Sequence, residues 1–275
     1  MAKRTSGTVA TASHVGGFMW LTLSVPGWQS ASAGQFALLQ PERSHCFLPR
    51  AFSVAEQDGD QVSFLIAEVG CGTLQLGRLS RGDKVWVTGP LGNGFPVPPP
   101  GRRAVAVGGG VGAAPFPLLL SQFGRNVLAG VPGSAECPDV VVLLGFRDQA
   151  QARGAQPVEK AAAALAGAGG NCRVVISTED GSQGTRGLVT DLVAAEIVPG
   201  DVLFVCGPHA MCEAIWDACR ARGVRDAWFS LEAGMACGTG SCYGCAVLMA
   251  DGTPARVCHD GPVFAGERVY GQGER

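Results

Sequence analysis

Short hydrophobic runs broken by turn residues dominate residues 8–95. The apolar stretches recur at fairly regular intervals, at residues 18–25, 35–39, 62–67 and 84–88. Turn signals such as Asp58-Gly59 and Gly89-Pro90 adjoin them. Strands of this length and spacing are typical of a β-barrel or sandwich, and the best helical candidate here is a short segment over residues 72–79. We therefore expect an N-terminal antiparallel β-barrel domain over residues 1–100.

Beyond the proline-rich connector at residues 96–101, the hydrophobic pattern changes. Apolar strands now alternate with segments of helical character. Strands are expected at residues 103–107, 140–146, 173–177, 201–206 and 224–231, and helices at residues 113–123, 160–168, 188–196 and 211–222. This alternation predicts a parallel sheet with right-handed crossovers. We expect an α/β nucleotide-binding domain over residues 101–230 and a small cysteine-rich domain over residues 231–275.

Composition and charge exclude several classes of function. The 275 residues are 47% hydrophobic and 16% charged, which indicates well-buried cores, and the net charge of −2 gives no electrostatic case for nucleic acid. The N-terminus lacks the apolar run of a signal peptide, and the apolar runs are too short to span a bilayer. We therefore expect a cytoplasmic protein. No Ser-His-Asp or Cys-His arrangement is legible, so hydrolytic chemistry has no support.

The C-terminal segment carries the strongest chemical motif. Cys237, Cys242 and Cys245 form a C-x4-C-x2-C run, and Cys258 follows. This spacing opens like the plant-type [2Fe–2S] loop, although the fourth cysteine comes sooner here. Small residues between the thiols allow tight turns and leave main-chain N–H groups free to point at sulfur. The motif therefore predicts four thiolate ligands around one [2Fe–2S] cluster.

Two other uses of these cysteines remain open. Four thiolates also suit a structural zinc ion, although zinc sites usually build on close C-x2-4-C or H-x3-5-H pairs. Disulfides fit poorly with an odd count of eleven cysteines and no secretory leader. The remaining cysteines are scattered, and most are expected to be small buried hydrophobes: Cys46, Cys71, Cys137, Cys172, Cys206, Cys212 and Cys219.

Two motifs of the β-domain suit a cofactor with a pyrophosphate and a flat ring. The run from Arg50 to Ser53 offers a forked cation, the aromatic ring of Phe52 and a hydroxyl. The run from Gly70 to Thr73 offers backbone amides and a hydroxyl at a helix start, where a phosphate can bind. Each is also compatible with an ordinary strand or turn, so neither is decisive alone.

Two glycine-rich turns of the α/β domain follow predicted strands. Residues 108–112 lie between a strand and a helix, the context that a dinucleotide site needs, although their spacing is not that of G-x-G-x-x-G. Cys206-Gly207-Pro208 lies at another strand's carboxyl end, the edge where ligands bind in open α/β sheets. Each is compatible with a structural turn, but their joint placement favours a nucleotide site.

Taken together, the motifs resemble the ferredoxin–NAD(P)⁺ reductase superfamily and, within it, the electron-transfer subunits of class 1B dihydroorotate dehydrogenases. The resemblance covers nearly the whole chain. Its most specific part is the cysteine run after Met235 with the ending from Cys258 through Asp260-Gly-Pro-Val to Phe264. The run from Arg50 to Ser53 resembles the family's R-P-x-S flavin motif.

The resemblance implies three sets of cofactor contacts. FAD contacts are expected at Arg50, Ala51, Phe52, Ser53, Leu65, Ile66, Ala67, Gly72 and Thr73. NAD contacts are expected at Gly109, Gly110, Gly112, Cys206, Gly207 and Pro208, and cluster ligands at Cys237, Cys242, Cys245 and Cys258. The chain departs from the family pattern where Ala51 replaces a proline and Ala67 a larger polar residue. Ala233 and Gly234 also stand where a basic residue is common.

The resemblance implies an electron relay without a catalytic side chain. A partner subunit containing FMN would oxidise dihydroorotate to orotate in pyrimidine biosynthesis, and single electrons would pass through the cluster to FAD. FAD would then give a hydride to NAD⁺. Two copies of each subunit would form a heterotetramer. Asp148 beside Arg147 would repel a 2′-phosphate, which favours NAD over NADP.

Two alternatives stay open at this point. The chain could serve another NAD(P)H oxidoreductase on the same scaffold, of the sulfide dehydrogenase or ferredoxin:NADP type. It could also be a zinc-binding or redox-sensing regulatory module. Copurification with a dihydroorotate-oxidising partner would distinguish the implied function from the first alternative. A visible absorption spectrum would distinguish it from the second.

Overall fold

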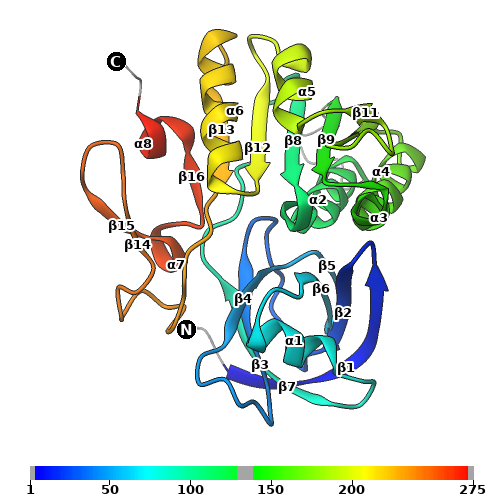
Figure 1. Cartoon of the computed structure of the whole chain (residues 1–275), viewed down its shortest axis with the longest axis vertical. Coiled ribbons are helices and arrows are strands. Elements are labelled where there is room, and N and C mark those ends of the chain that lie inside the picture. Colours follow the sequence, from blue (N-terminus) through cyan, green and yellow to red (C-terminus); the bar gives the residue numbers. More distant parts are fainter. Residues whose placement is uncertain (1–3, 129–138, 272–275) are drawn as a thin grey trace.

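The computed structural model describes residues 4–128 and 139–271, which form two seven-stranded sheets and a two-stranded hairpin. Figure 1 shows the first sheet, in blue to cyan, below the second. The first sheet is antiparallel, with the strand order β4-β3-β7-β1-β2-β6-β5. Its elements are β1 (Arg4–Val15), β2 (Phe18–Ser24), β3 (Phe36–Pro41), β4 (Arg50–Ser53), β5 (Glu56–Asp58), β6 (Gln61–Ala67), helix α1 (Cys71–Gly77) and β7 (Lys84–Leu91).

The first sheet curls into a barrel. Its two edge strands, β4 and β5, are joined by only Val54 and Ala55, so the sheet must bend until its edges are neighbours. The predicted β-barrel is therefore confirmed. Strand β1 is absent from the sequence-based expectation because it is rich in threonine, serine and alanine and buries few side chains. Strand β2 was expected, since its apolar residues alternate with half-buried ones.

The second sheet has the order β11-β10-β9-β8-β12-β13-β16 and is parallel except for β16, which runs antiparallel to β13. This confirms the predicted parallel sheet, and the five expected strands coincide with observed ones to within a few residues. The strands are β8 (Ala104–Gly109), β9 (Val140–Phe146), β10 (Cys172–Thr178), β11 (Thr185–Arg186), β12 (Val202–Cys206), β13 (Asp226–Ser230) and β16 (Val263–Ala265).

Helices cover both faces of the second sheet. Successive side chains of a strand point to opposite faces. In β8, Ala104 and Ala106 accordingly pack with α2 and α4, while Val105 and Val107 pack with α5 and α6. The helical elements are the 3-10 turn η1 (Gly110–Ala113), α2 (Phe116–Leu128), α3 (Gln149–Ala152), the 3-10 turn η2 (Arg153–Ala155), α4 (Gln156–Gly167), α5 (Val189–Glu196) and α6 (His209–Ala221).

The cysteine-rich segment packs against the barrel and also enters the second sheet. It contains β14 (Ala246–Leu248), β15 (Pro254–Arg256), α7 (Val257–Asp260), β16 and α8 (Gly266–Tyr270). A separate hydrophobic core joins Val257 and Phe264 of this segment to Phe36 and Leu38 of β3. The backbone N–H of Asn93 donates to the carbonyl of Gly261 at 2.6 Å. The segment is thus tied to both larger parts, while the boundaries at residues 100 and 230 remain predictions.

One continuous core runs from the barrel into the α2 face of the second sheet. At the junction, the rings of Phe95 and Phe204 meet edge to face with centroids 5.4 Å apart, and Phe18 lies 6.5 Å from Phe146. Aromatic packing of this kind adds to the burial of large apolar surface. Within residues 4–128 and 139–271, no helix has the length and hydrophobicity needed to cross a membrane.

Candidate functional site

A cleft of about 710 Å³ lies where the barrel, the second sheet and the cysteine-rich segment meet. This volume is in the range of pockets that hold a cofactor-sized molecule. Arg50 and Ser53 line it from β4, Cys206 from the end of β12, and Met235 and Gly244 from the cysteine-rich segment. Three stretches that are far apart in the sequence therefore share one cavity.

Arg50 is held at the barrel wall by its neighbours. Its Nη1 donates to the carbonyl of Leu48 at 2.8 Å and to that of Pro49 at 3.3 Å. The side chain passes directly over Gly72, where an added Cβ would stand 2.8 Å from Nε of Arg50. A glycine at this position thus leaves room for the guanidinium, although α1 itself would accept alanine.

The hydroxyl of Thr73 shapes the turn before α1. It accepts hydrogen bonds from the N–H groups of Val69 at 2.9 Å and Gly70 at 3.0 Å, and it donates to the carbonyl of Gly70. Thr73 lines the cleft and is buried. Its role in the structure is to fix the turn that presents the first residues of α1.

Strand β6 shows how alternation divides the predicted flavin contacts. Leu65 and Ala67 line the cleft, while the side chain of Ile66 between them is fully buried in the barrel core. Only the backbone of Ile66 can therefore face a cofactor. Ala51 and Phe52 line the cleft from β4 together with Arg50 and Ser53.

The two predicted glycine-rich turns lie against each other because β8 and β12 are neighbours. An added Cβ on Gly109 would meet Sδ of Met211 at 2.6 Å, and one on Gly112 would collide with the backbone of Cys206. Gly110 has φ +56°, a conformation that side chains rarely adopt. Gly207 and Pro208 complete this contact. The glycines thus allow two strand ends to meet beside Cys206.

Ser230 and Glu232 also line the cleft, beside Cys206, and the sequence analysis did not single them out. Glu232 is exposed as a residue, yet partial burial of its carboxyl raises its pKa. Burial is also the main cause that raises the pKa of Cys206, and the charge of Glu232 adds to it. An unpaired glutamate after a strand has no sequence signature, so only the fold identifies it.

The four predicted ligand cysteines come together as two pairs. The side chain of Cys242 interacts with Cys237, and that of Cys245 with Cys258. The charge of Cys237 also acts on Cys258, so the pairs are neighbours. Cys245 and Cys258 are buried, whereas Cys242 is exposed. The loop therefore leaves the sulfur of Cys242 at the surface on one side. On the other side, Cys245 and Cys258 belong to the separate hydrophobic core that contains Phe264.

Main-chain N–H groups point at all four sulfurs. Gly240 donates to Cys258 at 3.1 Å, and Thr239, Gly244 and the N–H of Cys258 donate to Cys237, Cys242 and Cys245, each at 3.4 Å. Burial raises the pKa of Cys237, but hydrogen bonds from Thr239 and Cys242 outweigh it and bring the pKa to about 6. Burial, followed by the hydrogen bond with Cys245, raises the pKa of Cys258 to about 12.

Arg256 fixes the helix that carries Cys258. Its guanidinium contacts the carboxylate of Asp260 at 3.1 Å and donates to the carbonyl of Gly240 at 3.2 Å. The hydrogen bonds from Arg256 hold the pKa of Asp260 well below its usual range. The acidic residue of the Asp260-Gly-Pro-Val-Phe ending thus links α7 to the cysteine loop.

The paired arrangement favours a two-iron cluster over zinc. A tetrahedral zinc site needs all four sulfurs about 2.3 Å from one ion and hence about 3.8 Å from one another. Two pairs of thiolates match a [2Fe–2S] core, in which each iron takes two protein ligands.

Arg147 and Asp148 follow β9 at the carboxyl edge of the second sheet. Arg147 is exposed, whereas the carboxylate of Asp148 accepts the N–H of Gln151 at 2.9 Å and caps α3. Glu179 and Asp180 form a turn directly after β10. Of the scattered cysteines, Cys206, Cys212 and Cys219 are buried, and Cys137 lies outside the described residues.

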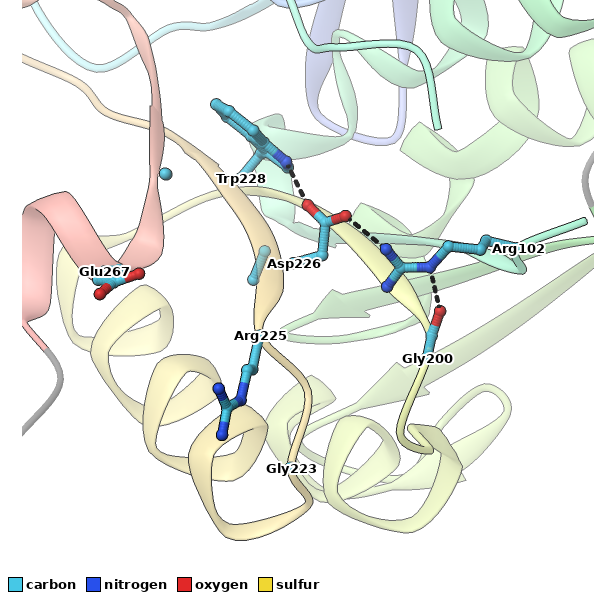
Figure 2. A pocket seen from close by; sticks show the side chains of 9 residues that line it. Arg102, Gly200, Gly223, Arg225, Asp226, Trp228 and Glu267 are labelled. Atoms are coloured by element: carbon cyan, nitrogen blue, oxygen red, sulfur yellow. Dashed lines mark hydrogen bonds and ion pairs between the residues drawn. The ribbon is translucent and has the colours of Figure 1, made fainter. Parts of the chain in front are cut away.

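A second pocket, of about 470 Å³, lies at the amino-terminal ends of β8 and β13. Figure 2 shows its polar wall, where Asp226 accepts from Arg102 at 2.7 Å and from Nε1 of Trp228 at 2.7 Å. Arg102 also donates to the carbonyl of Gly200. These contacts join the starts of neighbouring strands, opposite the edge that carries the predicted nucleotide turns.

Comparison with solved structures defines the fold class. The chain is similar to a structure described as that of an NADH-dependent reduced ferredoxin-NADP oxidoreductase, with a TM-score of 0.77 and 23% identity over 96% of this chain and 89% of that one. It is also similar to a ferredoxin NADP+ reductase from Neisseria gonorrhoeae with bound FAD and NADP, with a TM-score of 0.65 and 20% identity over 81% and 93% of the two chains. The fold is that of the ferredoxin reductases.

Sequence comparison is more specific. Residues 232–270 match the iron-sulfur cluster binding domain of dihydroorotate dehydrogenase B. The dihydroorotate dehydrogenase B (NAD(+)) electron transfer subunit of Caldanaerobacter subterraneus subsp. tengcongensis is 36% identical over 86% of both chains. The same subunit of Geobacillus thermodenitrificans is 37% identical over 88% of both. This chain belongs to the family of dihydroorotate dehydrogenase B electron transfer subunits.

Proposed function

We propose that this chain carries electrons from a dihydroorotate-oxidising partner to NAD⁺ in pyrimidine biosynthesis. The observation that supports this best is that Ser53, Cys206 and Gly244 line one cleft. These residues come from the predicted flavin motif, the predicted nicotinamide turn and the cysteine loop. A single cofactor in this cleft would therefore contact both the donor and the acceptor side.

In this proposal FAD occupies the cleft. Arg50 would pair with its pyrophosphate, aided by the turn at Gly72 and Thr73, because a guanidinium forks onto phosphate oxygens. Ser53 and Phe52 would face the flavin ring, and Leu65, Ala67 and the backbone of Ile66 would form its floor. The backbone at Ala51 does not need proline, since Ala51 pairs with Leu38 as an ordinary strand residue.

NAD would bind at the meeting point of the two glycine-rich turns. Gly109, Gly110 and Gly112 would let the dinucleotide approach the backbone, and Cys206 to Pro208 would bring its nicotinamide to the flavin. A 2′-hydroxyl suits the carboxylate of Asp148 better than a 2′-phosphate does. We therefore infer NAD in preference to NADP, in keeping with the names of the relatives.

The cysteine loop would hold a [2Fe–2S] cluster. Cys237 and Cys242 would bind one iron, and Cys245 and Cys258 the other, with the N–H groups of the loop offsetting the negative charge on sulfur. Bound FAD and the cluster together would supply the exchange between single electrons and a hydride. The side chains of this chain bind, orient and tune, and none is assigned an acid–base role.

The partner in this proposal is the catalytic subunit of dihydroorotate dehydrogenase B. We infer that it contains FMN, that two copies of each subunit assemble, and that the complex acts in the cytoplasm. Cys242 is exposed on the cysteine loop, as are the side chains of Tyr243 and Leu248. Docking at this side would bring a partner's cofactor near the cluster.

Coexpression with the candidate catalytic subunit tests the proposal. Dihydroorotate should then reduce NAD⁺, and the protein should contain iron and show flavin and iron–sulfur bands. Cys242→Ala should remove the cluster and abolish dihydroorotate-dependent turnover, while NADH still reduces an artificial acceptor at FAD. Partner-coupled turnover in protein without iron would show that the order of the relay is wrong.

A second candidate is another flavin and iron–sulfur reductase, of the ferredoxin:NADP or sulfide dehydrogenase type. Its support is the similarity of fold to the NADH-dependent reduced ferredoxin-NADP oxidoreductase over 96% of this chain. This candidate would replace the first if the purified chain exchanged electrons between NADPH and ferredoxin and did not couple to dihydroorotate oxidation.

A further inference from the structure

Two cysteines outside the cleft, Cys46 and Cys71, face each other on the barrel surface. Their sulfurs are 3.1 Å apart, although the residues are 25 positions apart in the sequence. Both thiols are free; Cys71 is exposed and Cys46 half-buried. A disulfide has an S–S bond of about 2.05 Å, so the two sulfurs need to approach by only about 1 Å.

Hydrogen bonds hold this pair in place. The carbonyl of Cys46 accepts from Gln40 at 2.9 Å, and its N–H donates to the hydroxyl of Ser44 at 3.0 Å. Gln75 on α1 accepts from Ser44 at 2.9 Å and points its amide nitrogen at both sulfurs, 3.8 Å from Cys46 and 3.6 Å from Cys71. The geometry of the pair is therefore set by three parts of the barrel: β3, the loop that carries Ser44 and Cys46, and α1.

We propose that Cys46 and Cys71 are a redox-controlled disulfide pair, closed by a peroxide and reopened by thiols. The two sulfurs lie in hydrogen-bond contact at 3.1 Å, and Cys71, as the exposed member of the pair, is the one that an oxidant reaches first. This hydrogen bond is also the main cause that raises the pKa of Cys46. Exposure of Cys71 gives the oxidant access to the attacking sulfur.

The reaction balances in two steps. The Cys71 thiolate attacks hydrogen peroxide, the O–O bond breaks, and a sulfenic acid and one water form after proton transfer. The sulfur of Cys46 then attacks that sulfenic sulfur, the S–O bond breaks, and a second water leaves with the Cys46 proton. Two thiols together lose two electrons, and one peroxide gains them. A dithiol reverses the change by becoming a disulfide itself.

The bond would brace the wall that carries Arg50. Cys46 lies shortly before Leu48 and Arg50, and Cys71 directly precedes Gly72, over which the side chain of Arg50 passes. A covalent link would join the two segments that flank this guanidinium. Since Arg50 is the proposed pyrophosphate ligand, this consequence rests on the proposed function: the oxidised protein should release FAD several-fold more slowly.

Peptide mapping of the full-length protein tests the pair itself. The reduced protein is treated with hydrogen peroxide, alkylated and digested without reductant. A peptide that links Cys46 to Cys71 is expected by mass spectrometry, and dithiothreitol should abolish it. Cys46→Ser and Cys71→Ser should each lack the link, whereas Cys172→Ser, at a half-buried cysteine elsewhere, should retain it.

The outcomes separate the pair from the proposed function. A link that forms in protein unable to bind FAD supports the pair and counts against FAD binding. Oxidation of Cys46 and Cys71 individually, with no link between them, would overturn the proposed pair. So would a bound metal ion other than iron that is lost when both cysteines are replaced by serine. Stopped-flow release of FAD should slow on oxidation in wild type and stay unchanged in Cys46→Ser.

Discussion

At the scale of single residues, the site depends on glycines whose lack of a Cβ leaves room for neighbouring groups. Gly72 leaves space for Arg50, and Gly109 and Gly112 let two strand ends meet. The sequence predicts these residues because glycine clusters after strands and at helix starts are recognisable patterns. It does not reveal Glu232 or Ser230, whose importance comes only from their place in the cleft.

We expect Gly72→Ala to weaken FAD binding about tenfold, since its Cβ would push the Arg50 guanidinium aside at a cost near 1.4 kcal/mol. The apo-protein should keep its stability or gain up to about 1 kcal/mol, because alanine favours a helix over glycine. Fluorescence titration with FAD and thermal unfolding measure the two effects. Gly70→Ala is the control, since its added Cβ meets nothing within 4 Å. Equal losses in both variants would contradict the role of Arg50.

We expect Glu232→Gln to raise the midpoint potential of bound FAD by roughly 10–30 mV at neutral or alkaline pH, because a nearby carboxylate disfavours the extra negative charge of a reduced flavin. Burial raises the pKa of Glu232, so its neutral form persists to higher pH than in an ordinary glutamate. Below that raised pKa the two proteins should have the same potential, and above it wild type should fall below the variant. Spectroelectrochemical titration across pH checks this, and a constant offset at every pH would exclude ionisation of Glu232 as its cause.

At the scale of elements, the length of a strand decides whether the sequence pattern predicts it. The five strands expected in the second sheet each contain a run of apolar residues, and all are present. Strand β16 has only three residues and pairs with β13, which precedes it by more than thirty positions, so local pattern gives no sign of it. Its partner is chosen by packing, because Phe264 enters the core beneath the cysteine loop.

Phe264→Ala should lower the free energy of unfolding by about 3–5 kcal/mol, since a fully enclosed aromatic ring would leave a cavity. The same change should reduce iron content, because Cys245 and Cys258 belong to the core that Phe264 fills. Denaturant unfolding and iron analysis measure both quantities. Leu248→Ala is the matched control, as Leu248 is 73% exposed on β14. Normal iron content in a destabilised Phe264→Ala protein would show that cluster binding does not depend on the packing of this core.

At the scale of the molecule, the sequence predicts the order of the parts but not their contact surfaces. Which residues of the barrel, the sheet and the cysteine segment share a cleft follows from packing between them. The pairing of the four thiols likewise depends on how α7 returns Cys258 to the loop. Arg256 contacts both Asp260 on α7 and Gly240 in the cysteine loop, and so holds α7 against that loop. The spacing of Arg256 from the cysteines matches no motif.

Leu248→Asp should weaken association with the catalytic subunit at least tenfold while iron content stays normal, because a charge would be buried without a partner at the proposed docking side. Val198→Asp is the control, since Val198 is an exposed apolar residue just after α5, far along the chain from the cysteine loop. Analytical ultracentrifugation of mixed subunits measures the affinities. Equal weakening of association by both variants would show that Leu248 is not part of the docking side.

The hydrogen bond between Asn93 and Gly261, together with the pairing of β16 with β13, ties the cysteine-rich segment to both the barrel and the second sheet. A hinge between those two bodies would have to break that tie and separate the aromatic rings of Phe95 and Phe204. In the proposed function, nicotinamide nucleotides would therefore bind and leave through local adjustments beside the cleft rather than through a movement of the two bodies. The distance that an electron would cross between a cluster on the cysteine loop and a flavin in the cleft would then stay constant during nucleotide exchange.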